Sequence, residues 1–423
     1  MAKELPNLRS KIFKWTSLIA QSSFMQILVQ GFGFLSGILI IRFLSIEEYA
    51  YYTIANALLG TMILLGDGGI GAGVMAEGGK YWENRNKLGV VLKTGLDLRN
   101  KFTTTSLIIS IPILFYLLMS QGASLVQAGI ICASLIPTFL ASVSDMLLEI
   151  PLRLHQDIKK LQNNQLQVSL GRAFLTIPLI LLFPFAFIGI IANGIARIYG
   201  NIRLRKLADN IIGVNFQADK EVRMRILRVV KRVLPGAIYY CLSGHLTIFI
   251  MSLFGDTKSL AQIGALERFI MTLTIIHTVA NILIVPRFAR LFLDKNLLFR
   301  RYIQILILSL VMLFSITILF YLFSDLLLLL LGDGYQNLKL ELVLCIFGGS
   351  IDMIAGIMNS LSNSKGWILR PSVSILISCL SIGLGIFLFD VTALLGVLYY
   401  FIFLATVQFA ISNTHLIYRI ERL

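Results

Sequence analysis

Residues suited to metal binding and acid–base chemistry are scarce in this sequence. Its 423 residues include only 4 cysteines and 4 histidines, and charged residues make up only 14% of the chain. The sequence contains no Walker phosphate-binding loop, no zinc-binding helix motif and no serine-hydrolase elbow. These absences argue against an enzyme. We therefore expect a protein without catalytic residues, metal or cofactor, and we expect any active process to draw on a proton or sodium gradient.

The cysteines show no sign of forming disulfides or a metal site. Each lies within an apolar stretch, and their spacing does not match that of metal ligands. Buried free cysteines behave as small hydrophobic residues. We therefore interpret all four as packing residues: Cys132, Cys241, Cys345 and Cys379.

Apolar residues, in contrast, are abundant. They make up 57% of the chain, and the mean hydropathy is +0.82. A soluble domain of this size could not bury so much apolar surface, whereas a helical bundle surrounded by lipid does not need to. The sequence predicts an all-α polytopic membrane protein with about twelve spans, separated by polar breaks. The spans are expected near residues 18–43, 50–75, 102–119, 125–148, 166–182, 185–202, 234–254, 260–285, 302–323, 340–361, 373–389 and 393–412.

Positive charge is distributed unevenly between the two expected sides of the membrane. The net charge is +15, with 37 Lys and Arg against 22 Asp and Glu. Nearly all the basic residues fall in the termini and alternate loops, and the opposite side has only Lys258 and Lys339. By the positive-inside rule, both termini are expected in the cytoplasm. The charge therefore indicates topology and contact with membrane lipids, and we expect no nucleic-acid partner.

The longest basic loop divides the predicted spans into two sets of six. We expect an N-terminal six-helix bundle over 1–202, a basic cytoplasmic linker over 203–232 and a C-terminal six-helix bundle over 233–423. Within the linker, Val222 and Ile226 share one helical face that basic residues surround, which predicts a helix lying in the membrane interface. Two parallel halves around a central cavity are typical of transporters built from repeats.

Three arginines fall within spans or at their ends: Arg42, Arg172 and Arg268. An ionised side chain inside the bilayer costs at least about 2.5 kcal/mol unless it faces protein or water, so these residues should face the interior. A guanidinium stays protonated and offers a planar fork of donors to phosphate oxygens. The arginines therefore favour an anionic, phosphorylated substrate. The alternative is that each arginine neutralises a nearby acid and locks helices together.

Several acidic residues also fall in or near the spans and could couple transport to an ion gradient. Asp67 lies among five glycines, which indicates either a hinge or close helix packing. Two acids have arginines nearby in sequence, which favours structural pairing: Glu267 precedes Arg268, and Glu149 lies one helical turn before Arg153. The candidate acids are Asp67, Asp145, Glu149, Glu267 and Asp352. Near them, Tyr49, Tyr51 and Tyr52 resemble an interfacial aromatic belt, and His245 and His277 are expected to be hydrogen-bonded interior residues.

Two stretches resemble a known family. One runs from Gly37 through Arg42 to Tyr52 and continues at Leu65-Gly66-Asp67-Gly68-Gly69-Ile70; the other is Leu152-Arg153-Leu154-His155-Gln156 leading to Gly171-Arg172-Ala173-Phe174. These segments resemble the polysaccharide biosynthesis family, the Wzx-type O-antigen flippases of the multidrug/oligosaccharidyl-lipid/polysaccharide (MOP) exporter superfamily. The family usually has glycine where this chain has Ala50. Chain length and span count also agree with the family.

The resemblance implies a flippase that moves an undecaprenyl-diphosphate-linked oligosaccharide, a repeat unit of O-antigen in lipopolysaccharide or of another surface polysaccharide. It would act by alternating access, from the cytoplasmic to the periplasmic leaflet of a bacterial inner membrane, alongside other polysaccharide-assembly membrane proteins. Arg172, Arg268 and Arg42 would bind the diphosphate or sugar. Coupling or gating would fall to Asp67, Asp352, Glu149 and Glu267.

Two other functions remain open. One is a cation-coupled drug or metabolite antiporter of the same superfamily, resembling the multidrug and toxin extrusion (MATE) exporters. Those exporters favour organic cations, which buried arginines would repel. The other is a membrane-embedded enzyme of polysaccharide assembly, although the predicted external loops are short and offer little room for an acceptor domain.

Overall fold

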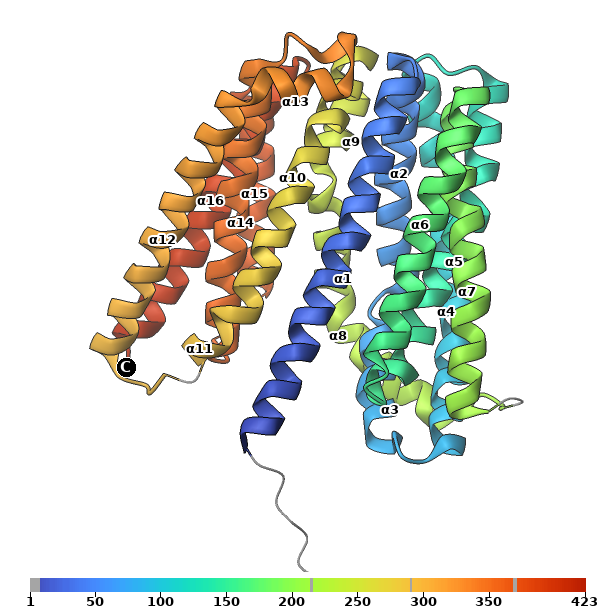
Figure 1. Cartoon of the computed structure of the whole chain (residues 1–423), viewed down its shortest axis with the longest axis vertical. Helices are drawn as coiled ribbons and strands as arrows, with labels where there is room; N and C mark the ends of the chain where they lie inside the picture. Colours follow the sequence, from blue (N-terminus) through green and yellow to red (C-terminus); the bar gives the residue numbers. More distant parts are fainter. Residues whose placement is uncertain (1–7, 214–215, 290, 368–370) are drawn as a thin grey trace, which may run out of the picture. The chain divides into compact units, whose positions relative to one another are not determined.

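The structure is a computed structural model that describes all residues except 1–7, 214–215, 290 and 368–370. Among the described residues the regular elements are all helices, and no strand occurs (Figure 1). The α-helices are α1 (Leu8–Phe43), α2 (Ile46–Asp67), α3 (Ile70–Gly78), α4 (Arg85–Ser120), α5 (Leu125–Leu154), α6 (Ile158–Leu182), α7 (Ala186–Ile212), α8 (Lys220–Gly244), α9 (Leu246–Phe254), α10 (Thr257–Leu283), α11 (Val285–Ala289), α12 (Lys295–Leu322), α13 (Ser324–Leu331), α14 (Lys339–Ser364), α15 (Pro371–Leu388) and α16 (Leu394–Glu421). Two short 3₁₀ turns are η1 (Gly79–Tyr81) and η2 (Asp333–Tyr335).

The predicted spans correspond to helices, confirming the all-α fold class. Each span coincides with one helix or with a consecutive pair, such as α2 with α3 and α8 with α9. Within the described residues, eight helices are long and apolar enough to cross a membrane. Two shorter apolar segments, Ile27–Phe43 and Val373–Leu388, add to them.

The largest error in the predicted boundaries concerns α4. The third span was expected to begin at residue 102, but α4 begins at Arg85. Val91 and Leu92 lie three and four residues after Leu88, and Leu98 lies seven residues after Val91. This is helical spacing, and all four residues are almost fully buried. The basic residues between them had indicated a loop. Burial of the apolar positions therefore extends the helix well beyond its purely apolar part.

The chain forms two compact units, and each has its own apolar core. The stretch predicted as a linker, 203–232, contains the end of α7 and the first half of α8. Unit 1 comprises the described residues of 1–37, 58–115 and 126–241, and unit 2 comprises 38–57, 116–125 and the described residues of 242–423.

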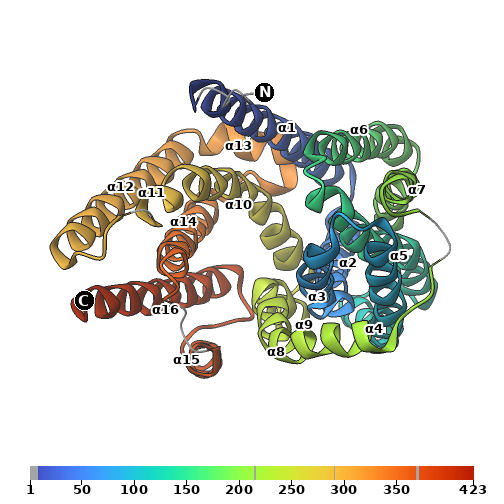
Figure 2. The same cartoon turned by 90° about the horizontal axis from the view of Figure 1, so that it is seen from below.

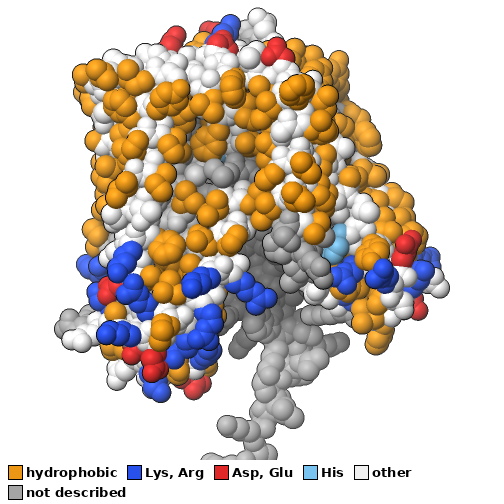
Figure 3. All heavy atoms as spheres, turned by 180° about the vertical axis from the view of Figure 1, so that it is seen from behind, with side chains coloured by type: hydrophobic (Ala, Val, Ile, Leu, Met, Phe, Trp, Pro, Cys, Tyr) orange, Lys and Arg blue, Asp and Glu red, His pale blue; other side chains and the backbone are white. Residues whose placement is uncertain are grey.

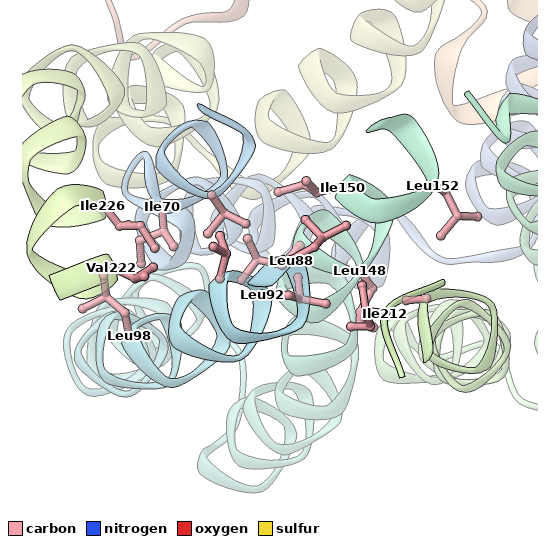
Figure 4. Packing of buried hydrophobic residues seen from close by; sticks show 14 of the residues in the cluster. Ile70, Leu88, Leu92, Leu98, Leu148, Ile150, Leu152, Ile212, Val222 and Ile226 are labelled. Carbon is pink, nitrogen blue, oxygen red and sulfur yellow. The ribbon is translucent and has the colours of Figure 1, made fainter. Parts of the chain in front are cut away.

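The core of unit 1 joins α3, α4, α5, α6, α7 and α8, and Figure 4 shows part of it. Val222 and Ile226 of α8 pack beside Ile70 of α3. A Cβ at Gly73 would lie 2.9 Å from the Ile226 side chain, so this glycine permits the contact between α3 and α8. The apolar face of this part of α8 is therefore buried in protein, and its location at the membrane interface stays a prediction.

The core of unit 2 is built around α14, which packs against α10, α12 and α16. Two neighbouring glycines of α14 face two different helices. A Cβ at Gly349 would lie 3.1 Å from Leu273 of α10, and a Cβ at Gly348 would lie 2.8 Å from Phe401 of α16. Small residues allow helices to approach closely within a membrane.

The surface of unit 1 has the character expected of a membrane protein. On the face visible in Figure 3, hydrophobic side chains cover much of the surface, and Lys and Arg side chains gather toward its lower end. Large apolar residues such as Phe174 and Leu182 are more than 70% exposed. Lipid would solvate such residues, so the exposed apolar surface supports the predicted membrane location.

Candidate functional site

Asp67 is the last residue of α2, and its side chain caps the start of the next helix, α3. The backbone N–H groups of Gly69 and Gly71 donate to its carboxylate at 3.2 and 3.0 Å, so Asp67 satisfies two donors at the start of α3. Gly68 and Gly69 have φ values of 51° and 87°, in the left-handed region that favours glycine. The glycines near Asp67 therefore form a sharp break between two helices.

Arg99 neutralises Asp67. Its guanidinium donates to the Asp67 carboxylate and to the backbone carbonyl of Val143, which ties α4 to α2 and α5. Only 2% of the Arg99 side chain is exposed. Sequence reasoning missed Arg99 because it assigned this residue to a cytoplasmic loop.

The two acids of α5 also have basic partners. Glu149 accepts from Arg153 at 2.5 Å and from Gln165 of α6 at 3.3 Å, as the structural alternative for Glu149 predicted. Asp145 accepts from Arg197 at 3.2 Å and from Asn201 at 2.7 Å, both on α7. Arg197 was not among the predicted intramembrane arginines, although it lies within an expected span.

Arg172 projects from α6 toward α1. Its guanidinium is so close to the α1 backbone that a Cβ at Gly33 would lie 2.8 Å from Nη2. Any larger residue at position 33 would displace the arginine. The sequence gives Gly33 no visible role, and the structure explains it as the residue that makes room for this cation.

In unit 2, Arg268 of α10 lies against tyrosines of α2. Its Nε is 3.5 Å from the Tyr49 hydroxyl, and its guanidinium lies over the Tyr52 ring, 5.9 Å from the centroid. The Tyr49 hydroxyl donates to the Gly264 carbonyl at 3.0 Å. Among the described residues, no carboxylate lies within ion-pairing distance of Arg268, and this includes its neighbour Glu267.

The predicted aromatic belt is wrong. Tyr49 is fully buried, and Tyr51 and Tyr52 are 5% and 6% exposed. Tyr49 binds the backbone of α10, and the Tyr51 hydroxyl lies 3.5 Å from the Gln121 carbonyl. The sequence shows only that several tyrosines lie near a helix end. A belt at the lipid headgroups and a tyrosine cluster buried between helices both have this pattern, so the sequence cannot distinguish them.

Two acids lie on α10 and α14. Glu267 is half-buried and interacts electrostatically with Arg268. Asp352 lies on an exposed position of α14 and interacts electrostatically with His277 of α10. The side-chain amide nitrogen of Asn281, one turn later on the same helix, lies 3.1 Å from His277 Nε2. His277 is therefore a hydrogen-bonded residue, as predicted, and it lies close to an acid.

Arg42 differs from the other two predicted arginines. It lies at the end of α1 on an exposed position, and a Cβ at Gly332 would lie 3.9 Å from its Cγ. The structure therefore places Arg268 against Tyr49 and Tyr52 within unit 2, and leaves Arg42 at a helix end, where its charge can reach the interface.

A charged cluster outside the spans involves Glu77 at the end of α3. Its carboxylate pairs with Lys80 at 2.7 Å and with Arg225 of α8 at 2.7 Å. Burial opposes ionisation of Glu77, but the hydrogen bond from Lys80 and the charge of Arg225 outweigh it and hold the pKa of Glu77 below its usual value. This cluster fixes α8 to α3 at the basic end of unit 1.

The described residues contain no group of three or more His, Cys, Asp or Glu side chains that could hold a metal ion.

No family model matches this sequence, and the search of curated proteins gives no match. Solved structures do resemble it. A multidrug resistance MATE family transporter of the MOP superfamily, in an inward-facing conformation, superposes with a TM-score of 0.71 at 14% identity, covering 94% of this chain and 96% of that chain. A mutant of a Vibrio cholerae MATE transporter gives a TM-score of 0.61 at 17% identity, covering 96% and 98%. A MATE protein in complex with MaL6 gives 0.63 at 14% identity, covering 96% of each. The chain therefore has the fold of MATE transporters.

Proposed function

We propose that this protein is a membrane transporter that works by alternating access and flips an undecaprenyl-diphosphate-linked oligosaccharide between the leaflets of a bacterial inner membrane. The MATE-like fold supports transport. The resemblance of the Gly37–Tyr52 segment to Wzx-type flippases supports a lipid-linked oligosaccharide, such as an O-antigen repeat unit.

The observation that carries the proposal is the environment of Arg268. This arginine lies near the middle of α10, on a tyrosine hydroxyl and a tyrosine ring, and has no carboxylate at ion-pairing distance among the described residues. Its positive charge is therefore available to an anionic ligand. A guanidinium binds phosphate oxygens through two parallel hydrogen bonds, which suits a diphosphate.

The acids support ion coupling to different degrees. Asp67 and Glu149 already form ion pairs within unit 1, which gives both a structural role. Asp352 is exposed on α14 beside His277, and Glu267 lies next to Arg268. We propose that Asp352 and Glu267 are the better candidates for proton or sodium coupling, with Asp67 and Glu149 maintaining the helix arrangement.

The same proposal includes the topology and partners. The gathering of Lys and Arg side chains near one end of unit 1 supports cytoplasmic termini and contact with anionic lipids. A flippase would receive its substrate from membrane glycosyltransferases and release it to polymerising or ligating enzymes.

A drug antiporter is the second candidate, and Asp352 favours it. An exposed carboxylate within a membrane helix attracts organic cations, and the similar solved structures include multidrug transporters. The charge of Arg268, which no described carboxylate meets at ion-pairing distance, opposes this candidate because it repels cations.

Transport in liposomes tests the proposal. A fluorescent undecaprenyl-diphosphate oligosaccharide is followed from the outer to the inner leaflet, with and without a pH or sodium gradient, and a cationic dye is assayed in parallel. We expect Arg268→Ala to lower the initial rate at least roughly tenfold, because it removes a charge-assisted contact, and Arg268→Lys to retain part of the rate.

The matched control is Arg301→Gln, which removes a positive charge from an exposed position of α12 whose hydrogen bond, among the described residues, is to Gln304 of the same helix. Its transport rate should equal that of the unmodified protein. If the dye moves and no lipid-linked glycan does, the proposal of a flippase is rejected in favour of the drug antiporter.

A further inference from the structure

The packing of α6 against α7 fixes the positions of two arginines in unit 1. A Cβ at Gly171 of α6 would lie 3.6 Å from the Ala196 Cβ of α7, and a Cβ at Gly200 of α7 would lie 2.2 Å from the Val168 side chain of α6. As the residue number falls on one helix it rises on the other, so the helices are antiparallel. Figures 1 and 2 show them side by side.

Arg172 follows Gly171, and Arg197 follows Ala196. Each step along an α-helix rotates the side chain by about 100°. When two antiparallel helices touch at one residue each, the next residue along each chain points to the same side of the helix pair. Arg172 and Arg197 therefore lie at the same depth and project to the same side of the α6–α7 pair.

The observed contacts agree with this placement. Arg172 reaches α1 at Gly33, and Arg197 reaches Asp145 of α5. The residues on the other faces of the two helices are apolar and exposed, as Phe174 at 73% and Ile195 at 48% show. Both guanidinium groups therefore lie on the protein side of the α6–α7 pair, between α1 and α5.

Asp145, the acid that pairs with Arg197, is more deeply buried than the arginine. Only 11% of the Asp145 side chain is exposed, against 37% of the Arg197 side chain. Asn201 donates to the other carboxylate oxygen of Asp145 at 2.7 Å. More of the Arg197 side chain than of Asp145 is therefore exposed, and the hydrogen bond from Asn201 uses a different carboxylate oxygen from the one that Arg197 binds.

We propose that Arg172 and Arg197 together form a diphosphate-binding subsite in unit 1, and that Asp145 is the internal counter-ion that holds Arg197 in position while the subsite is empty. The inference rests on the proposed function and adds a second place where the substrate's phosphates bind. On binding, a phosphate oxygen competes with the Asp145 carboxylate for the Arg197 guanidinium. Two guanidinium groups offer one fork to each phosphate of a diphosphate.

The ion pair with Asp145 gives the inference a distinctive test. Asp145→Asn removes the competing charge, so it should raise the affinity for a diphosphate, by roughly fivefold or more. Arg197→Gln should lower the affinity by roughly tenfold or more. A purely structural ion pair predicts the opposite for Asp145→Asn, because loosening the α5–α7 contact could only weaken binding.

Binding is measured on the full chain in nanodiscs of zwitterionic lipid by native mass spectrometry. The probe is undecaprenyl diphosphate without sugar, and undecaprenyl monophosphate is the comparator. Arg197→Lys should bind with intermediate affinity, because it keeps the charge and loses the fork. The control is Arg153→Gln, which removes an exposed arginine paired with an acid of the same helix α5 and should leave affinity unchanged.

The outcomes separate the subsite from the proposed function. Equal diphosphate affinity in Arg197→Gln and the unmodified protein, at equal thermal stability, overturns the subsite even if oligosaccharide is transported. If diphosphate binding depends on Arg197 but no glycan moves in liposomes, the subsite is supported and the proposed flippase function is rejected. Absence of any diphosphate binding by the unmodified protein overturns the subsite. If Asp145→Asn lowers stability, its affinity is compared at a temperature where both proteins remain folded.

Discussion

Replacing Asp67 with asparagine would remove the charge that balances Arg99 and leave most of the local geometry in place. An asparagine oxygen can still accept from the Gly71 N–H, which now donates to Asp67 at 3.0 Å. The guanidinium of Arg99 would keep the Val143 carbonyl but lose its counter-ion at a position where only 2% of its side chain is exposed. Removal of one partner from a buried ion pair costs about 3 to 5 kcal/mol. We expect Asp67→Asn to lie near the lower end of that range.

The free energy of unfolding is measured by detergent titration in mixed micelles, with tryptophan fluorescence as the signal. Trp82 lies in unit 1, next to the His155 ring, and reports on this part of the chain. The control is Asp97→Asn, which breaks an exposed pair with Lys93 on the same helix as Arg99. An exposed pair contributes about 1 kcal/mol or less.

A double variant isolates the interaction between the two charges. Asp67→Asn combined with Arg99→Met removes both charges, so it should be more stable than Asp67→Asn alone, because no unpaired charge stays buried. If Asp67→Asn costs no more than Asp97→Asn, Arg99 does not depend on Asp67 and the structural role assigned here is wrong. A lost gradient dependence of transport at unchanged stability would instead return Asp67 to the coupling residues.

Two further predictions concern packing and pH. Gly264→Ala places a Cβ 2.4 Å from the Thr53 hydroxyl, so it should lower the free energy of unfolding by about 1 to 3 kcal/mol, whereas Gly129→Ala, with no neighbouring atom within 4 Å, should be neutral or stabilising in the same titration. The lowered pKa of Glu77 stabilises the folded protein above the usual carboxyl pKa, and this stabilisation is lost as the pH falls through the lowered value. When the free energy of unfolding is measured between pH 7 and pH 3, Arg225→Gln should therefore lose less stability than the unmodified protein. An equal loss in both proteins would contradict the assigned ion pair between Glu77 and Arg225.

The sequence predicted the helical fold well because lipid imposes a simple rule. A chain that crosses a bilayer must satisfy its backbone groups within each segment, so long apolar runs become helices. The same rule failed at α4 and α8. There, buried apolar residues alternate with exposed basic ones, and only the packing of Leu88 or Ile226 against other helices shows that these stretches belong to a protein core.

The charged residues were predicted less completely. Their presence in the spans could be counted, but the partner of each depends on helix rotation and depth, which one sequence does not determine. Glu149 and Arg153 were recognised because they are one helical turn apart. Asp67 and Arg99, or Asp145 and Arg197, are far apart in sequence, and only the packing of different helices brings them together.

The pairing of Asp67 with Arg99 also has a consequence for biosynthesis. The two residues are 32 positions apart in the chain, so Asp67 at the end of α2 leaves the ribosome before Arg99 does. An unpaired carboxylate resists entry into the hydrocarbon region, which would hold the end of α2 at the headgroups until α4 follows. α2 and α4 are therefore expected to enter the bilayer as a pair, and variants of Arg99 should show their defect in the yield of inserted protein as well as in the stability of the finished one.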